Sequence, residues 1–389
     1  MYFIKKLFNN RRNKIVMIIG LLSICSLITI YGVTPQLVGY GDSIPINFVL
    51  KQGIGIVVGF FIIFLFSKFD LWKSEKYIDI INIILIVMLV ILALDPPIIG
   101  DIFVKEINGA KGWFKIPFLP TIQPIEFFKI TMIFKLASIA NRANNTHMDD
   151  QELIKQFLIF GALPILCVIL QPDLGGAILL LAPWLLISII SLQHNKKIQK
   201  LVKYTSVIGI VGLVMISFPF FQEILVKFTP LKAYQLGRIE SWTDPFNTSG
   251  GYQLQQSLIL MGSAGIKGYG FANIDILIPE PHTDVIFPEF VGMFGWIAGI
   301  VLILLYMSLL YLTLKIAIVA TEYRDKLLIL GFFSLLLVQI IENIGMMLGI
   351  TPITGIVLPF MSYGVSALIT YFIIFAIICN ISQKYKSLD

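Results

Sequence analysis

Long runs of apolar residues fill most of this chain and alternate with short polar segments. A helix needs roughly 20 apolar residues, with a range of about 17 to 25, to cross the hydrocarbon core of a bilayer. The pattern therefore predicts an all-α integral membrane protein that forms a single polytopic domain over residues 1–389. Ten spans are predicted, at residues 15–33, 48–67, 79–95, 123–140, 156–171, 174–192, 202–220, 283–313, 327–348 and 364–382.

Two places in this pattern are less regular. The fifth and sixth spans are separated only by Gln171, Pro172 and Asp173. The eighth run is long enough to include a segment that lies at the membrane interface before the helix crosses the bilayer. The seventh and eighth spans are joined by a large loop at about residues 221–282, which with residues 96–122 offers the only room for chemistry in water.

The composition supports a membrane protein and excludes a soluble enzyme. Hydrophobic residues make up 57% of the chain and charged residues only 13%, a balance typical of membrane-embedded proteins. Cys25, Cys167 and Cys379 all lie inside apolar runs, so neither a disulfide framework nor a cysteine metal site is indicated. A basic segment precedes the first run, but no small-residue cleavage site follows it, and we expect a retained first helix.

Basic residues predict the orientation of the chain. With the N-terminus in the cytoplasm, 19 of the 29 lysines and arginines fall on the cytoplasmic side, 7 fall on the opposite side and 3 lie inside or at the edge of spans. Cytoplasmic loops carry such an excess, so both termini are expected in the cytoplasm and the large loop outside. The same excess accounts for the formal net charge of +6 and favours contact with anionic membrane lipids rather than nucleic acid.

Residues 238–252 form a polar, turn-rich stretch within the large loop. Asp244 precedes Pro245, which disfavours a helical conformation for the acid, and Asn247 and Gly250 favour turns. Asp244 is therefore predicted to be presented on a loop. Taken alone, an Asp-Pro pair is more typical of a simple turn than of an active site.

Ionisable residues in or near the spans are further candidates, because they are costly in hydrocarbon. Glu126 and Lys129 lie three residues apart on one helix face, as a structural ion pair or as the charged wall of a cavity that opens outward. Asp173 and His282 each stand at the start of a span, where a simple helix cap is favoured. Glu289, in the eighth span, is equally consistent with a satisfied interior polar group.

A link rich in proline and glycine, residues 352–364, precedes the last span. Irregular backbone near membrane depth is tolerated only where protein or a cavity covers it. The link is therefore expected to line a pocket or groove. With the candidates above, it places nearly every unusual polar group at the outer face.

Together these motifs resemble the SEDS family (shape, elongation, division and sporulation; RodA/FtsW/SpoVE-type proteins), in the family's order and across essentially the whole chain. The matching segments are Gly109-Ala110 with Trp113, Gln123-Pro124 with Glu126 and Lys129, Gln171 to Gly175, Arg238-Ile239 to Trp242, Asp244-Pro245, Gly251 to Gln253, Pro279-Glu280, His282 to Asp284, Ile286-Phe287, Asn343 to Gly345, Pro352, Thr354-Gly355 and Ser362 to Gly364.

The resemblance implies a peptidoglycan glycosyltransferase that polymerises lipid II at the outer face of the cytoplasmic membrane. Asp244 matches the family's essential acid, and a loop carboxylate of this kind serves as a general base. The leaving diphosphate needs positive charge, from Arg238, Lys129, Lys111 or a bound divalent cation such as Mg²⁺ or Mn²⁺. The remaining residues expected to bind substrate are Glu126, Asp173, His282, Ser362 and Tyr363.

By the same resemblance, the expected partner is a class B penicillin-binding protein. The motifs are shared by the branches that serve cell shape, cell division and sporulation, so the branch stays open. The chain departs from the family pattern at Ile125, where a serine is usual, at Gly292-Met293, where two glutamates are usual, and at Val365, where a glycine is usual. A lipid II flippase and a non-catalytic scaffold for a transpeptidase remain alternatives.

Overall fold

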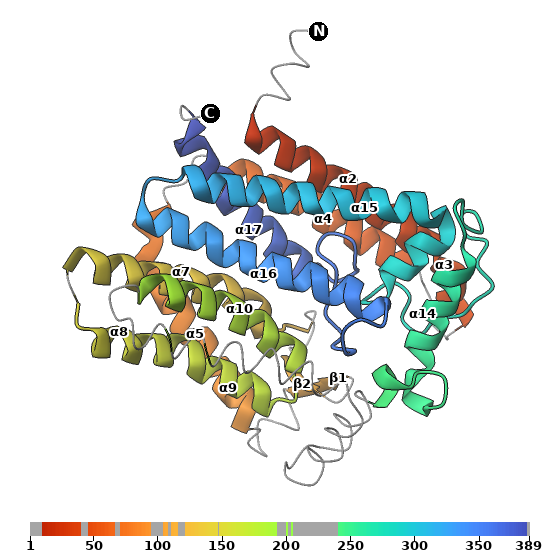
Figure 1. The fold of residues 1–389 in the computed structure, drawn as a ribbon, viewed down its shortest axis with the longest axis horizontal. Coiled ribbons are helices and arrows are strands. Elements are labelled where there is room, and N and C mark those ends of the chain that lie inside the picture. Colours follow the sequence, from red (N-terminus) through yellow and green to blue (C-terminus); the bar gives the residue numbers. More distant parts are fainter. Residues whose placement is uncertain are drawn as a thin grey trace. The chain divides into compact units, whose positions relative to one another are not determined.

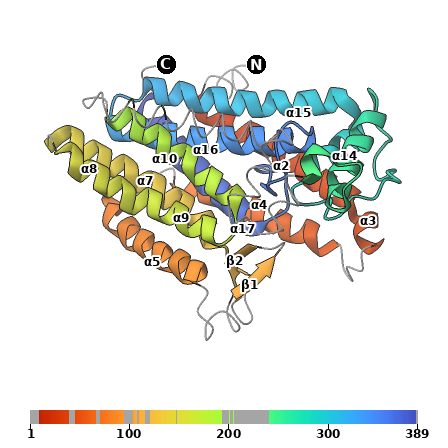
Figure 2. The ribbon, with the colours of Figure 1, turned by 60° about the horizontal axis from the view of Figure 1, so that its bottom comes forward.

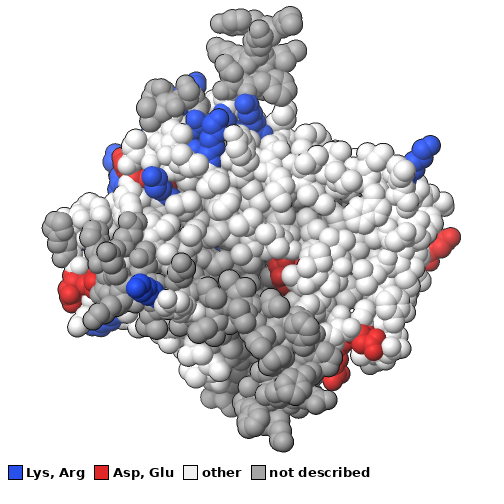
Figure 3. Space-filling view, viewed as in Figure 1, with Lys and Arg blue, Asp and Glu red and all other residues white. Residues whose placement is uncertain are grey.

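The computed structural model describes residues 10–39, 46–66, 71–94, 104–107, 110–115, 121–146, 148–192, 200, 204 and 240–386. Within these residues, eight helices are long and apolar enough to cross a membrane. Most of the described atoms on the face shown in Figure 3 belong to neither acidic nor basic side chains. The prediction of an all-α membrane protein is confirmed, while the orientation of the termini stays a prediction.

Helices account for nearly all of the regular structure (Figure 1). In chain order the elements are α2 (Arg11–Gly32), α3 (Thr34–Gly39), α4 (Ile46–Phe66), η1 (Leu71–Ser74), α5 (Glu75–Leu94), β1 (Val104–Ile107), β2 (Ala110–Phe114), α7 (Pro124–Thr146), α8 (Asp150–Phe157), η2 (Leu158–Ala162), α9 (Leu163–Leu170), α10 (Leu174–Ser191), η3 (Ser249–Gly251), α14 (Tyr252–Ser263), α15 (Ile286–Val319), α16 (Tyr323–Met347) and α17 (Val365–Lys384).

Each predicted span that falls on described residues coincides with helix. The fourth coincides with α7, which carries Glu126, Lys129 and Lys135 and is not among the eight apolar helices. The fifth is built from three consecutive pieces, α8, the π-helical turn η2 and α9. The seventh predicted span, residues 202–220, lies outside the described residues.

A two-stranded antiparallel hairpin, β1–β2, departs from the all-helical expectation (Figure 2). Val104 pairs with Phe114 and Lys105 with Trp113. The hairpin falls in the first of the two predicted outer loops, residues 96–122. Its strands are too short and too polar to stand out as strands in the sequence.

The chain divides into two compact units, each assembled from separate stretches of sequence. One unit contains Met1–Leu65, Leu213–Leu312 and Gln339–Lys386; we call it unit 1. The other, unit 2, contains Phe66–Gly212, Thr313–Val338 and Ser387–Asp389. Helices α15 and α16 each contribute residues to both units.

In unit 1, side chains from the helices satisfy the backbone of the irregular link at residues 352–364. Ser26 on α2 donates its hydroxyl to the carbonyl of Met361, 2.7 Å away. Gln52 on α4 donates its amide to the Ser26 hydroxyl and to the carbonyl of Ser362, both at 3.1 Å. Buried carbonyl groups need such partners, so these helix amides and hydroxyls explain how irregular backbone is tolerated there.

In unit 2, α5 packs on α7 along a line of polar pairs. The α5 residues recur at the spacing of one helix face, and their partners on α7 run in the opposite direction. The pairs are Glu75 with Ser138, Asp79 with Lys135 and Asn82 with Thr131. Polar side chains in apolar surroundings are stabilised by such pairing, which fixes the register of α7 and hence the placement of Glu126 and Lys129.

Candidate functional site

Asp244 lies exposed on a tight turn of unit 1. Residues 240–243 are helical and lead into it, and the Asp244 amide donates to the carbonyl of Glu240 at 2.9 Å. The side-chain amide of Asn247 donates to both carboxylate oxygens, at 2.9 and 3.0 Å. The Thr248 hydroxyl donates to the Asp244 carbonyl at 2.9 Å. The acid is thus held by its own turn with its carboxylate open to solvent.

Contacts with residues farther along the chain tether this turn to the rest of unit 1. The indole N–H of Trp242 donates to the carbonyl of Gly349, 2.9 Å away, just after α16. Gly251 lies so close to Pro245 that a Cβ at position 251 would be 2.4 Å from the Pro245 carbonyl oxygen. Only glycine fits such a close approach. The Asp-Pro turn is therefore folded back on the start of α14.

The N-terminal end of α14 is in turn fixed to the segment before α15. The Gln253 side chain donates to the carbonyl of Pro279 at 3.2 Å. Three residues after Pro279, His282 lies buried. This contact places the Asp244 turn and the His282 segment in one connected part of unit 1.

His282 is packed among aromatic rings. Its ring centroid lies 4.4 Å from that of Phe48 and 5.3 Å from that of Tyr363, and the Tyr363 amide donates to the His282 carbonyl at 2.8 Å. Burial raises the pKa of Tyr363 above its usual value, so its phenol stays protonated. His282 and Tyr363, both expected to bind substrate, are therefore brought together.

Ser362 is engaged in local structure. Its hydroxyl accepts a hydrogen bond from the Leu358 amide at 2.8 Å, and the side chain is buried. Nearby, the Asn343 amide on α16 donates to the carbonyls of Asp284 and Ile356, at 2.8 and 2.7 Å. Ser362 thus shapes the link beside His282 and Tyr363.

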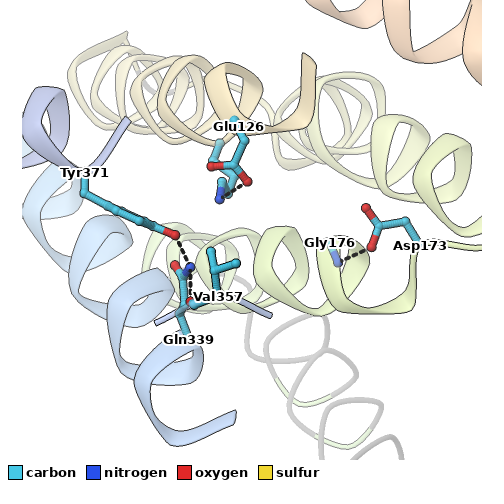
Figure 4. A network of polar contacts seen from close by, with 7 residues as sticks. Glu126, Asp173, Gly176, Gln339, Val357 and Tyr371 are labelled. Atoms are coloured by element: carbon cyan, nitrogen blue, oxygen red, sulfur yellow. Dashed lines mark hydrogen bonds and ion pairs between the residues drawn. The ribbon is translucent and has the colours of Figure 1, made fainter. Parts of the chain in front are cut away.

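Glu126 and Lys129 form a buried ion pair in unit 2. The Lys129 Nζ lies 2.8 Å from the Glu126 Oε1, and their side chains are only 1% and 10% exposed. Figure 4 shows the Glu126 carboxylate turned toward its partner one turn along α7. The predicted pairing on one helix face is confirmed; whether the pair also meets substrate stays a prediction.

Asp173 is the N-cap of α10. Its Oδ1 accepts a hydrogen bond from the Gly176 amide at 2.8 Å (Figure 4), which confirms that it caps the helix. The preceding Gln171 is buried, donates its side chain to the Leu89 carbonyl at 2.9 Å and accepts from the Lys111 amide at 3.2 Å. Lys111 on β2 therefore lies beside the start of the sixth span.

The predicted site residues fall into two groups. Asp244, His282, Ser362 and Tyr363 belong to unit 1, whereas Glu126, Lys129, Lys111 and Asp173 belong to unit 2. Arg238 lies outside the described residues. Among the residues that the structure describes, no three or more His, Cys, Asp and Glu side chains are grouped to hold a metal ion.

The eighth span is interrupted shortly after Gly292-Met293. Gly295 has φ 78° and ψ 176° inside α15, so a short leading segment, residues 286–294, precedes the main helix. Gly292 packs against Leu260, which would lie 2.7 Å from a Cβ, and Met293 is buried against Val33. The two positions where the resemblance leads us to expect acids are apolar packing positions in the structure.

Buried amide residues were missed in the sequence. Within the same leading segment, Glu289 is fully buried and accepts a hydrogen bond from the Gln36 side chain at 3.2 Å. Gln36, Gln52 and Gln339 all make buried polar contacts. Because they are uncharged, a search for ionisable groups within apolar runs passes over them. For Gln52 and Gln339, which lie inside predicted spans, the polar amide was the available signal.

Comparison with known proteins agrees with this architecture. The family model of the FtsW, RodA and SpoVE proteins, described as cell cycle proteins, matches residues 12–387. Stage V sporulation protein E of Bacillus subtilis (strain 168) is 28% identical over 382 residues, which cover 95% of this chain and 96% of the relative. A probable peptidoglycan glycosyltransferase FtsW of Lactococcus lactis subsp. lactis (strain IL1403) is 30% identical over 334 residues, or 81% and 78% of the two chains.

Solved structures share the fold. A chain from a structure described as "Structural coordination of polymerization and crosslinking by a peptidoglycan synthase complex" superposes with a TM-score of 0.71 at 20% identity, covering 96% of this chain and 98% of that one. The crystal structure of the rod shape determining protein RodA of Thermus thermophilus gives a TM-score of 0.62 at 19% identity, with 95% and 96% covered. With the family model matching nearly its full length, the chain belongs to the FtsW, RodA and SpoVE family of cell cycle proteins.

Proposed function

We propose that this chain polymerises lipid II into glycan strands at the outer face of the cytoplasmic membrane, with Asp244 as the general base. The broader assignment rests on the family: the chain is a peptidoglycan glycosyltransferase of the integral membrane type, as its relatives are named. The observation that carries the finer proposal is the exposed carboxylate of Asp244, held on a tethered turn in the large loop.

The chemistry requires one proton to leave the acceptor. A sugar hydroxyl of the acceptor attacks the anomeric carbon of the donor, and its proton passes to the Asp244 carboxylate. The new glycosidic C–O bond forms as the bond from the anomeric carbon to the diphosphate breaks, and the electron pair leaves with the diphosphate. A positioned general base typically contributes about 10²- to 10⁴-fold in rate.

The contacts that Asn247 makes leave Asp244 able to act as a general base. The Asn247 side-chain amide donates a hydrogen bond to each carboxylate oxygen of Asp244. An ionised carboxylate can accept about four hydrogen bonds, so these two do not use all of its acceptor positions. Positions on the solvent side therefore stay open to an incoming hydroxyl. The turn holds the acid in one orientation before substrate arrives, which is the condition for efficient proton transfer.

Positive charge for the leaving diphosphate would come from Lys129, Lys111 or Arg238. Lys129 is oriented by Glu126, and basic groups fixed in position stabilise developing negative charge. The described residues offer Asp244 as a carboxylate ligand but no group of three or more ligands. A further source of positive charge would be a divalent cation such as Mg²⁺ or Mn²⁺ that arrives on the diphosphate and keeps several of its water ligands. Such a cation would supply charge neutralisation.

By family likeness the cross-linking partner would be a class B penicillin-binding protein. The experiment is lipid II polymerisation by the purified full chain with that partner, comparing the native protein with Asp244→Asn. Asp275→Asn is the matched control, because Asp275 is also an exposed acid of the large loop. Loss of glycan strands with Asp244→Asn alone supports the proposal; equal polymerisation by both variants contradicts it. Movement of labelled lipid II across vesicles without polymerisation would instead indicate a flippase.

A further inference from the structure

We propose that residues 265–271, here called the interface tip, form a membrane anchor that inserts into the headgroup region of the bilayer. The interface tip follows α14 in unit 1, and α14 and the leading end of α15 lie side by side in both ribbon views (Figures 1 and 2). The occupant of this surface is the lipid bilayer itself. The inference does not depend on the catalytic role of Asp244.

The interruption of α15 sets the depth of the interface tip. Backbone groups of the tip pair with those of the interruption: Tyr269 donates to Gly292 at 2.8 Å, Gly270 to Met293 at 3.1 Å, and Trp296 to Gly265 at 3.0 Å. After the interruption, residues 296–319 rise by roughly 36 Å at 1.5 Å per residue, enough for a hydrocarbon core of about 30 Å. The tip therefore lies where the spanning part of α15 begins.

A second spanning helix, α2, independently places the interface tip at the same level of the bilayer. The Phe271 ring stacks on Tyr31 with centroids 6.0 Å apart. Tyr31 lies in the last turn of α2, near the end of the membrane-length apolar stretch Arg11–Gln36. Trp296 donates its indole N–H to the Met261 carbonyl at 2.9 Å. Tyrosine and tryptophan are enriched at the boundary between hydrocarbon and water. The ends of α2 and of the main part of α15 thus place the interface tip at one membrane boundary.

The exposed side chains of the tip match that boundary. Ile266 is 67% exposed, Phe271 46% and Tyr269 41%, and Lys267 beside them is exposed. Large apolar groups with a neighbouring cation are typical of interfacial anchors, in which the cation meets anionic headgroups. The exposed apolar surface continues onto Ile297 in the first turn of the main part of α15.

An anchored tip would hold the Asp244 turn at the membrane surface. Helix α14 joins the two, and its 12 residues span roughly 18 Å. The turn is fixed to the start of α14 by the Gly251–Pro245 approach, and the tip follows the end of α14. The height of the acid above the bilayer is then set by the tip.

The test uses single-cysteine versions of the full chain in nanodiscs of phosphatidylcholine and phosphatidylglycerol. Cys25, Cys167 and Cys379 are replaced by alanine, and an environment-sensitive nitrobenzoxadiazole label is attached at Ile266→Cys or, separately, Tyr269→Cys. Asp275→Cys is the matched control, an exposed polar position of the same loop. Quenching is measured with aqueous iodide and with lipids that carry a nitroxide near the headgroup.

Labels on the interface tip should emit at shorter wavelength than the control, resist iodide and be quenched by the nitroxide lipid. The control label should be quenched by iodide alone. Two outcomes overturn the proposal: iodide quenching of both tip labels at the level of the control, or shielding of the tip labels only after a protein partner is added, which would make the tip a protein-binding surface. Two tip positions guard against a local effect of one substitution.

Discussion

The indole N–H of Trp242 donates a hydrogen bond to the carbonyl of Gly349, 2.9 Å away, across 107 residues of sequence. This contact ties the turn that carries Asp244 to the segment that follows α16. Because Asp244 itself is exposed, its orientation depends on tethers of this kind. Catalysis by a loop acid is therefore sensitive to residues that never touch the substrate.

Replacing Trp242 tests this dependence. Trp242→Phe keeps most of the ring packing but removes the hydrogen bond, which is worth about 1 kcal/mol. We expect an approximately five-fold lower rate of lipid II polymerisation, from a turn that is less often correctly placed, with the melting temperature nearly unchanged. A native rate for folded Trp242→Phe would show that this tether does not position the acid.

Because Glu126 and Lys129 form a buried ion pair, we expect the single and the double substitution to change thermal stability by very different amounts. Lys129→Met leaves the Glu126 charge buried without its ion-pair partner, which costs about 3–5 kcal/mol. Adding Glu126→Gln should restore most of the lost stability, because no isolated charge then remains. Thermal unfolding in detergent measures both variants.

The same double variant separates structure from function. If the pair also binds the substrate diphosphate, Glu126→Gln with Lys129→Met should be folded yet defective in polymerisation. A stable double variant with native activity would show that the ion pair has only a structural role in α7.

The interruption in α15 predicts that glycine is required at position 295. A Cβ there would lie 2.1 Å from the Ile266 carbonyl oxygen, and φ is 78°, a region that other residues rarely adopt. Gly295→Ala should lower the melting temperature clearly and reduce polymerisation. Gly262→Ala on α14 is the control: a Cβ there meets nothing within 4 Å, so it should be neutral or slightly stabilising. Equal melting temperatures for the two variants would argue against the interruption.

The packing at positions 292 and 293, where the resemblance leads us to expect acids, predicts the result of introducing them. Met293 is 1% exposed, and a side chain at position 292 would meet Leu260. The variant that combines Gly292→Glu with Met293→Glu would bury two carboxylates against side chains that are apolar in the native protein. Burying them lowers the free energy of unfolding by several kcal/mol. We expect lower yield and lower thermal stability. A folded variant with raised activity would mean that the apolar pair limits the enzyme.

The spans were predictable because a helix that crosses lipid must be long and apolar. That requirement appears in the sequence as a continuous run of apolar residues. The loop position of Asp244 was predictable for a similar reason, since Asp-Pro followed by Asn247 and glycines encodes a turn locally. The Glu126–Lys129 pair followed from helical spacing alone.

What escaped prediction depends on contacts between distant segments. The length of the eighth run indicated an entry segment, but nothing near Gly295 marks where the helix is interrupted. Gly295 lies against the backbone of Ile266, and the next residue, Trp296, donates its amide to the Gly265 carbonyl on that separate loop. Gln52 reads as a polar residue in an apolar run, and its role follows from Ser26 and Ser362. Apolar packing at Gly292 and Met293 likewise depends on Leu260 and Val33, which no local pattern reveals.

The most direct test of the central claim is the length and yield of glycan strands made from lipid II by the purified full chain with its partner, for the native protein, Asp244→Asn and Asp275→Asn. Thermal unfolding should show all three folded. The general-base role predicts that Asp244→Asn loses about 10²-fold or more in rate, while Asp275→Asn matches the native protein. Strands of native length and yield from folded Asp244→Asn would contradict it.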